Sequence, residues 1–254
     1  MYPVHSWFRS IYPAKILPFE IEMKAGLLIC DHILPELEHI NGQYIDMFNQ
    51  LLPELELIPY YVCDGEFPKG PGEHEVYVCT GSKYSVYDQH PWIKELCTFV
   101  DQIYHAEKVF IGLCYGHQMM AHALGGEVAK SNHGWCIGVH EFELNDEAEW
   151  IDPRQENFSL LMMCQDQVTK LPPRSKVFAQ SNKCPVAMYT IGNRFLGVQA
   201  HPEFSKEYNR ALFTSRTERI GEQVVADAIT QMDKPLNTQQ VVRWIMNFIK
   251  LSIR

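Results

Sequence analysis

The stretch IGLCYGHQ, residues 111–118, decides the fold. The apolar run Lys108–Leu113 predicts a strand that leads directly into Gly-x-Cys-x-Gly, and Gly116–Leu124 predicts a short helix. Glycines two residues before and two residues after a central residue permit a tight strand-to-helix turn that exposes the side chain between them. We therefore expect Cys114 to lie at the tip of such an elbow.

Strands and helices alternate on both sides of this turn. The predicted strands are Ala25–Cys30, Leu57–Val62, Val76–Thr80 and Lys108–Leu113, and apolar residues at helical spacing predict helices around residues 44–52 and 91–103. This alternation is typical of an α/β fold with a mostly parallel central sheet and helices on both faces.

The second half of the chain has a different pattern. Short strand-like pieces between Glu127 and Gln199, namely Val139–Leu144, Val177–Ala179 and Phe195–Ala200, predict extra antiparallel strands. Two helical patterns, Tyr208–Ile220 and Val241–Ile249, follow and predict a C-terminal helical extension. We expect a single large domain.

Composition excludes several classes of function. The formal charge of −9 disfavours binding to nucleic acid or to an anionic membrane surface. No apolar stretch approaches the roughly 20 residues that span a bilayer, and residues 1–22 do not resemble a secretory signal. The eight cysteines include no Cys-x-x-Cys pair, and several lie in apolar runs. These features favour a protein of the reducing cytoplasm.

The elbow could form part of a catalytic site if its cysteine is reactive. The N-terminus of the following helix lowers the pKa of a nearby thiol, and the Tyr115 N–H becomes a donor for an oxyanion. A cysteine nucleophile also needs a base and a group that orients it. In the segment Phe195–Glu203, an apolar strand ends in His201-Pro202-Glu203, where residues i and i+2 share one side. Taken singly, each motif also fits a buried cysteine or a strand-end histidine beside a solvated glutamate.

Together the two motifs resemble the class I glutamine amidotransferases, whose signatures are a Gly-x-Cys-x-Gly-x-Gln elbow and a distant His-Pro-Glu. The resemblance covers about residues 25–204 and divides the chain into an N-terminal arm of uncertain role (1–22), a catalytic domain (23–204) and a helical extension packed on the same domain (205–254). It implies that Cys114 attacks a glutamine or γ-glutamyl carbonyl to form a γ-glutamyl thioester, with His201 as base and Glu203 orienting it.

The resemblance also implies roles for residues around the triad. Gln118 matches a substrate-binding position, and Gln165 and Asp166 match a segment near the substrate carboxylate. Ser82 and Tyr115 would supply the oxyanion-hole N–H groups. Two positions depart from the family pattern: Gly81-Ser82-Lys83 replaces a common Gly-Gly-Pro, and Cys164 stands where relatives have histidine. We interpret Lys83 as facing solvent and Cys164 as a buried structural residue.

The sequence predicts no metal site and no cofactor. His117 and His122 are five residues apart, which does not place them on one helix face, and His133, Cys136 and His140 lack the spacing of metal ligands. The predicted partner is a small-molecule substrate.

Several hypotheses remain open. In 254 residues there is no room for a synthetase domain, so the leading hypothesis is a free-standing hydrolase of glutamine or γ-glutamyl conjugates, similar to γ-glutamyl peptidases. The alternatives are a glutaminase subunit that delivers ammonia to a separate synthetase, as in guanylate synthesis, and a catalytically silent binding module. A related cysteine fold of stress proteins ranks last, because Tyr115 replaces the histidine that such proteins place after the elbow cysteine.

Overall fold

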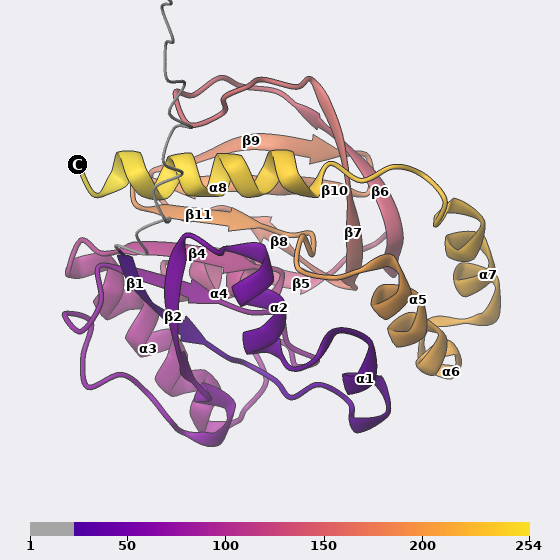
Figure 1. Cartoon of the computed structure of the whole chain (residues 1–254), viewed down its shortest axis with the longest axis horizontal. Coiled ribbons are helices and arrows are strands. Elements are labelled where there is room, and N and C mark those ends of the chain that lie inside the picture. The colour runs from indigo at the N-terminus through magenta and orange to yellow at the C-terminus, as the bar shows by residue number, and fades with distance from the viewer. Residues whose placement is uncertain (1–22) are drawn as a thin grey trace, which may run out of the picture.

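A nine-stranded mixed sheet forms the centre of the molecule in the computed structural model, which describes residues 23–254 (Figure 1). Its strand order is β2-β1-β3-β4-β11-β10-β9-β6-β7, and β5 and β8 form a separate two-stranded ribbon. The strands are β1 (Met23–Leu28), β2 (Leu55–Tyr60), β3 (Val76–Cys79), β4 (Val109–Leu113), β5 (Glu127–Lys130), β6 (Cys136–Leu144), β7 (Asn157–Cys164), β8 (Asp166–Lys170), β9 (Ser175–Ser181), β10 (Cys184–Ile191) and β11 (Phe195–Val198).

The sheet has a parallel and an antiparallel half. Strands β2, β1, β3, β4 and β11 run parallel, whereas β10, β9, β6 and β7 continue the sheet in antiparallel pairs. In the register of the parallel half, Leu113 at the end of β4 pairs with Val198 at the end of β11. Because carboxyl ends of parallel strands meet at one edge, the segments that follow these two strands emerge side by side.

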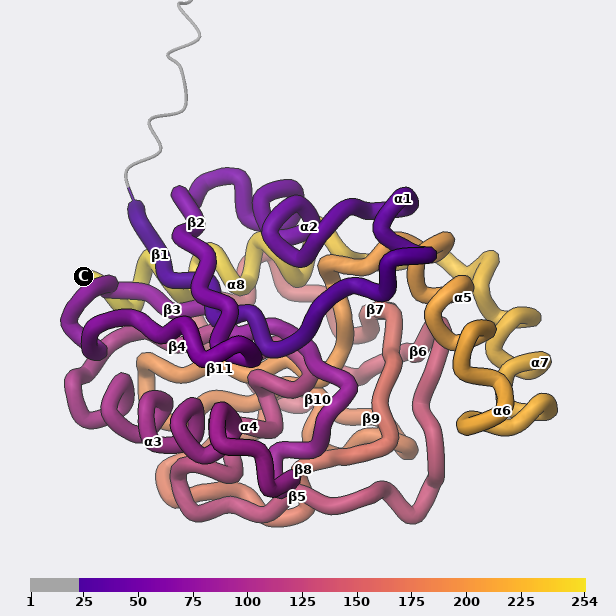
Figure 2. The backbone as a smooth tube through the Cα atoms, turned by 90° about the horizontal axis from the view of Figure 1, so that it is seen from below, coloured from indigo at the N-terminus to yellow at the C-terminus, as the bar shows by residue number. Residues whose placement is uncertain are grey.

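Helices cover both faces of the parallel half, as Figure 2 shows with α2 and α8 on one side and α3 and α4 on the other. The helical elements are η1 (Pro35–Leu37), α1 (Glu38–Asn41), α2 (Tyr44–Leu51), η2 (Val62–Asp64), α3 (Pro91–His105), α4 (Tyr115–Ala123), α5 (Lys206–Ser215), α6 (Thr217–Ile220), α7 (Glu222–Gln231) and α8 (Thr238–Ser252). The sheet therefore has two separate buried layers, one under each set of helices.

The C-terminal helix α8 lies across one face of the sheet (Figure 1). Val241 and Trp244 are fully buried, and the Trp244 indole N–H donates to the Pro153 carbonyl at 2.9 Å. At the other end of the helix, the Ser252 hydroxyl donates to the Asn193 carbonyl, and Arg194 donates to the Ser252 carbonyl. These hydrogen bonds anchor α8 to neighbouring segments through its middle and its C-terminal end.

The predicted fold class is confirmed, with corrections to individual elements. The expected helix over Tyr208–Ile220 is two helices, because the chain leaves helical geometry at Arg216 (φ −111°, ψ 17°). Strands β5, β7, β8 and β10 and helices α1 and α7 were not predicted individually. Helix α7 buries only Val225 and Ala228, which is too narrow an apolar stripe to stand out in the sequence. The predicted arm, residues 1–22, lies outside the described residues, and the boundary at 204 stays a prediction.

The elbow between β4 and α4 is closed by direct backbone packing. A Cβ atom at Gly112 would lie 2.4 Å from the Gly116 carbonyl carbon, and one at Gly116 would lie 2.6 Å from the Cys79 carbonyl oxygen. Both glycines are therefore required because the backbone segments approach so closely. The turn also forms hydrogen bonds to its neighbours, from the Cys114 N–H to the Val198 carbonyl and from the Gly116 N–H to the Thr80 carbonyl.

Among the helices of residues 23–254, none combines the length and the apolar character needed to span a membrane.

We predict that Gly112→Ala lowers the free energy of unfolding by about 1–3 kcal/mol, because the added methyl group overlaps backbone atoms of α4 that cannot move independently. Urea denaturation measures this loss. Gly72→Ala is the matched control: a Cβ there would meet no atom within 4 Å, so the change should stay within about 0.5 kcal/mol. Equal stability of the two variants would contradict the packing argument.

Candidate active site

Cys114 occupies the tip of the elbow in a strained backbone conformation. Its φ of 49° and ψ of −95° are unusual for a residue with a side chain, and the residue precedes the first turn of α4. The side chain is 4% exposed and lines a pocket at the carboxyl edge of the sheet. A thiol held at a helix N-terminus faces the positive end of the helix dipole, which favours its thiolate form.

His201 and Glu203 follow β11, the strand next to the elbow strand. The His201 Nδ1 atom lies 2.7 Å from Glu203 Oε1, so the expected pairing of residues i and i+2 is present. Phe204 stacks on the imidazole with ring centroids 4.1 Å apart, and the His201 N–H donates to the Leu161 carbonyl. The ring is thus held by a carboxylate at one nitrogen and by an aromatic face.

Cys114 and His201 both lie close to Gly81. A Cβ atom at Gly81 would lie 2.9 Å from His201 Cε1 and 3.8 Å from Cys114 Cβ. The absence of a side chain at this position therefore lets the imidazole approach the cysteine. The sequence placed these residues on separate strands, and the parallel pairing of β4 with β11 brings them together.

The electrostatics of His201 differ from those of other buried histidines. Burial lowers the pKa of His140 to about 4 and that of His117 to about 3. Burial acts in the same direction on His201, but the negative charges of Cys114 and Glu203 outweigh it and raise the pKa to about 10. The His201 Nε2 atom has no hydrogen-bond partner in the described part of the chain, so Cys114 acts on it chiefly through charge. The site therefore favours the protonated form of the His201 ring.

The loop after β3 carries Ser82 and Lys83 and is fixed by Asp31. The Asp31 carboxylate accepts from the Lys83 backbone N–H and from Lys83 Nζ, both at 2.9 Å, while the Ser82 hydroxyl donates to the Cys30 carbonyl at 2.8 Å. Lys83 is therefore ion-paired rather than simply facing solvent. Asp31 is 5% exposed, and its position at the end of the first strand is the sequence signal for this role.

The expected substrate-binding residues line the same pocket as Cys114. Gln118 is nearly buried, and its Nε2 donates to the Asp166 carbonyl at 2.7 Å and to Gln199 Oε1 at 3.1 Å. Because both amide hydrogens have partners, the Gln118 carbonyl oxygen is the atom left for a ligand. The Asp166 carboxylate accepts from Ser85 Oγ, which fixes its direction.

Other residues of the pocket were missed by sequence reasoning. Lys130, Arg216 and Arg219 join Lys83 around the pocket, so four cationic side chains accompany the single carboxylate of Asp166. A chain with a net charge of −9 thus presents a locally positive pocket. Arg219 lies over the Trp135 ring at 5.1 Å. Arg216 lies at the break between α5 and α6, and Arg219 lies in α6, and no pattern in the sequence marks either of them.

Cys164 lies at the end of β7, where it is 5% exposed and lines the pocket. Burial, followed by the charge of Cys114, raises the pKa of the Cys164 thiol well above its usual value. Both effects keep this second thiol protonated, so it differs from Cys114 in being unsuited to nucleophilic attack.

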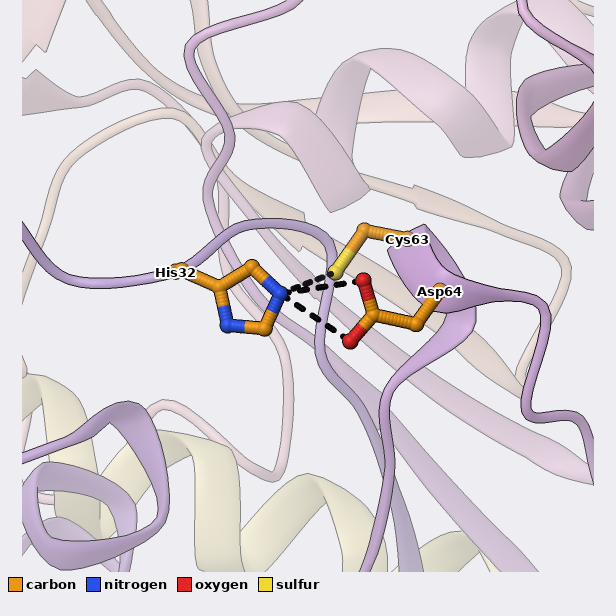
Figure 3. A group of neighbouring side chains, drawn as sticks. All are labelled: His32, Cys63 and Asp64. Carbon is orange, nitrogen blue, oxygen red and sulfur yellow. Dashed lines mark hydrogen bonds and ion pairs between the residues drawn. The ribbon is translucent and has the colours of Figure 1, made fainter.

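Metal-capable side chains converge at one place in residues 23–254, and it is not among the histidines considered from the sequence. His32, Cys63 and Asp64 point toward one another (Figure 3), and one ligand atom from each lies within 4.8 Å of the others. By contrast, His117 is fully buried beside Tyr189, and the His140 ring contacts the Ile137 carbonyl. His32 lies in the loop after β1 and Cys63 lies in η2, which hides their proximity in the sequence.

The comparisons with known proteins agree with this geometry. The family described as "Glutamine amidotransferase class-I" matches residues 81–217, which include the elbow and the His-Pro-Glu segment. The chain therefore belongs to the class I glutamine amidotransferase family, whose members are generally hydrolases.

The chain is similar to relatives of more than one kind. The chain is 31% identical over 175 residues to gamma-glutamyl peptidase 4 of Arabidopsis thaliana, covering 65% of this chain and 70% of the relative. It is also 31% identical over 204 residues to a glutamine-hydrolysing GMP synthase of Aeropyrum pernix, covering 77% of this chain but 36% of that relative. A glutamine amidotransferase from Thermotoga maritima has the same fold, with a TM-score of 0.71 at 19% identity over 91% of this chain and 99% of that one.

We predict that Cys114→Ala and Glu203→Gln each lower the pKa of His201 by about 1–3, because each removes one negative charge that favours the imidazolium. In the unmodified protein, whose His201 pKa is about 10, the ring should stay protonated at pH 8 and lose its proton only in the alkaline range. Nuclear magnetic resonance titration of the histidine rings measures these values. His140 serves as an internal control that neither change affects, and an unaltered His201 titration in both variants would refute the charge coupling.

Proposed function

We propose that this protein is a cysteine hydrolase that cleaves a γ-glutamyl amide, in glutamine or in a γ-glutamyl conjugate, through a γ-glutamyl thioester. The single observation that carries the proposal is the convergence of Cys114 with the His201–Glu203 pair across Gly81. Family membership and the resemblance to gamma-glutamyl peptidases support it. The eight free thiols support a reducing compartment such as the cytoplasm as its setting.

The first half of the proposed reaction acylates Cys114. The thiolate attacks the γ-carbonyl carbon, and the carbonyl electron pair moves onto oxygen, where the N–H groups of Ser82 and Tyr115 stabilise the oxyanion. When the oxyanion collapses, the carbon–nitrogen bond breaks, and His201 Nε2 gives its proton to the departing nitrogen. The leaving group is ammonia or the amine of a peptide, and Glu203 stabilises the imidazolium through Nδ1.

The second half releases glutamate. Neutral His201 removes a proton from water, whose oxygen attacks the thioester carbonyl, and the carbon–sulfur bond breaks to restore the thiolate beside the imidazolium. Burial of Cys114 and of the His201–Glu203 pair limits access to bulk water. The ion pair is consequently poorly screened, and the fixed charges act more strongly than they would in solvent.

The pocket has groups suited to an amino-acid end. In the proposed complex, the Gln118 carbonyl oxygen and the Asp166 carboxylate accept from the substrate ammonium group, while Gln165 lines the adjacent wall. The cations Lys130, Arg216 and Arg219 surround the same pocket and favour a substrate with carboxylates. Conjugates such as acidic γ-glutamyl peptides match this charge better than a neutral amide.

A second function is favoured by the match to GMP synthase, which covers 77% of this chain. In this alternative, the chain supplies ammonia from glutamine to a separate synthetase. It predicts weak glutamine hydrolysis by the isolated protein and strong activation by a co-purifying partner. The peptidase hypothesis instead predicts full turnover of γ-glutamyl peptides by the isolated chain.

We predict that Cys114→Ala and His201→Ala abolish hydrolysis of the preferred γ-glutamyl substrate, whereas Glu203→Ala retains a measurable fraction, because the ring keeps its position against Phe204 without its carboxylate partner. Steady-state assays with glutamine, γ-glutamyl-p-nitroanilide and γ-glutamyl peptides measure these rates. Cys164→Ala is the control for a neighbouring thiol and should remain active.

Labelling of the protein by a glutamine-mimicking electrophile distinguishes a cysteine hydrolase from a catalytically silent binding module. Cys114 should react faster than the other seven cysteines, as mapped by mass spectrometry. Uniform labelling of all cysteines, together with no turnover of any substrate, would favour a catalytically silent binding module. An active Cys114→Ala protein would refute the mechanism itself.

A further inference from the structure

A group of three side chains with different donor atoms lies outside the candidate active site. His32 comes from the loop after β1, whereas Cys63 and Asp64 come from η2, which follows β2 (Figure 3). Because β1 and β2 are parallel neighbours, their carboxyl ends deliver these two loops to one edge of the sheet. The side chains thus converge although 31 residues separate His32 from Cys63.

The distances from His32 Nε2 to the other donor atoms are within about 0.5 Å of those around a tetrahedral zinc ion. His32 Nε2 lies 3.7 Å from Cys63 Sγ and 3.0 Å from either carboxylate oxygen of Asp64. Zinc bonds of about 2.1 Å to nitrogen or oxygen and about 2.3 Å to sulfur place such atoms about 3.3–3.6 Å apart at tetrahedral angles. Cys63 Sγ and an Asp64 carboxylate oxygen lie within 4.8 Å of each other, so modest movements of these two side chains would bring all three donor atoms into ligand positions.

The backbone around the group is held in place by several contacts. The Cys63 N–H donates to the Ile29 carbonyl, and the Ile29 N–H donates to the Tyr60 carbonyl, so the two loops are cross-linked at their bases. Tyr61 stacks on the His32 ring, with the ring centroids 5.7 Å apart and an angle of 13° between the ring planes. This stacking helps to orient the ring and its Nε2 atom. Gly65 ends η2 in the left-handed conformation and turns the chain away.

We propose that His32, Cys63 and Asp64 form a binding site for Zn²⁺. One imidazole, one thiolate and one carboxylate make up a donor set that suits zinc, and the two anionic ligands balance the charge of the ion. The side chains of His32 and Asp64 are 53% and 50% exposed, so an ion can enter from solvent and keep a water molecule in the fourth position. Binding of zinc at this site does not require the hydrolase function proposed above.

The zinc site is linked to the loop that carries Ser82. Asp31 accepts from the His32 backbone N–H at 2.9 Å through one oxygen and from the Lys83 backbone N–H at 2.9 Å through the other. An ion that ties His32 to η2 therefore also restrains the segment to which the Ser82–Lys83 loop is bonded. We expect zinc to raise the melting temperature and to reduce the mobility of this loop.

The test is metal binding by the full chain in a Cys114→Ala background, which removes the active-site thiol as a competing ligand. Cobalt serves as a spectroscopic probe, because a cobalt–thiolate bond produces near-ultraviolet charge-transfer absorption, and zinc affinity is measured by competition with a chromophoric chelator. We expect one equivalent of cobalt with this absorption, its displacement by zinc, and a higher melting temperature.

Substitutions assign the ligands. Cys63→Ser should abolish the charge-transfer band, and His32→Gln or Asp64→Asn should weaken zinc binding by more than about 10-fold. Cys97→Ser and His39→Gln are matched controls, as each removes a cysteine or a histidine elsewhere, and they should bind normally. Melting temperatures without metal verify that all variants fold. No thiolate band, or equal affinity in the Cys63→Ser and Cys97→Ser proteins, would show that these residues form only a surface ion pair and would overturn the proposal.

Discussion

Backbone contact at the elbow is the constraint on which the rest of the structure depends. Gly112 packs against the start of α4, and Gly116 packs against Cys79, so β3, β4 and α4 meet at very close range. This contact forces Cys114 into its strained conformation and points its sulfur toward the pocket. The strain is supported by hydrogen bonds to two neighbouring strands and by the buried layers on both faces of the sheet.

The proposed active site also requires that the buried imidazole of His201 can carry a positive charge. An imidazolium without partners is costly inside a protein, as the depressed pKa values of His117 and His140 illustrate. His201 avoids this cost because it lies beside the Glu203 carboxylate and close to Cys114, and the absence of a side chain at Gly81 leaves room for the ring. The side chains of Cys114, His201 and Glu203 thus stabilise one another. Removing any one of them makes the burial of the other two unfavourable.

The sequence predicted the fold class and the pair of strands that meet at the site, because each depends on local patterns. The Gly-x-Cys-x-Gly turn has a steric cause that is visible in a few residues, and the spacing of His201 and Glu203 follows from strand geometry. The break at Arg216 and the position of Arg219 were not predictable, because tertiary packing decides them. The contact of His32 with Cys63 was missed for the same reason: it depends on which strands are neighbours.

The position of α8 has a consequence for biosynthesis. This helix covers the face of the sheet that contains β4 and β11, and its Trp244 and Val241 belong to the same buried layer as Ile111 and Val198. A ribosome-bound chain therefore exposes that apolar layer until residues 238–252 have emerged from the exit tunnel. Until then, the uncovered apolar layer against the strands that carry Cys114 and His201 is open to association with other apolar surfaces.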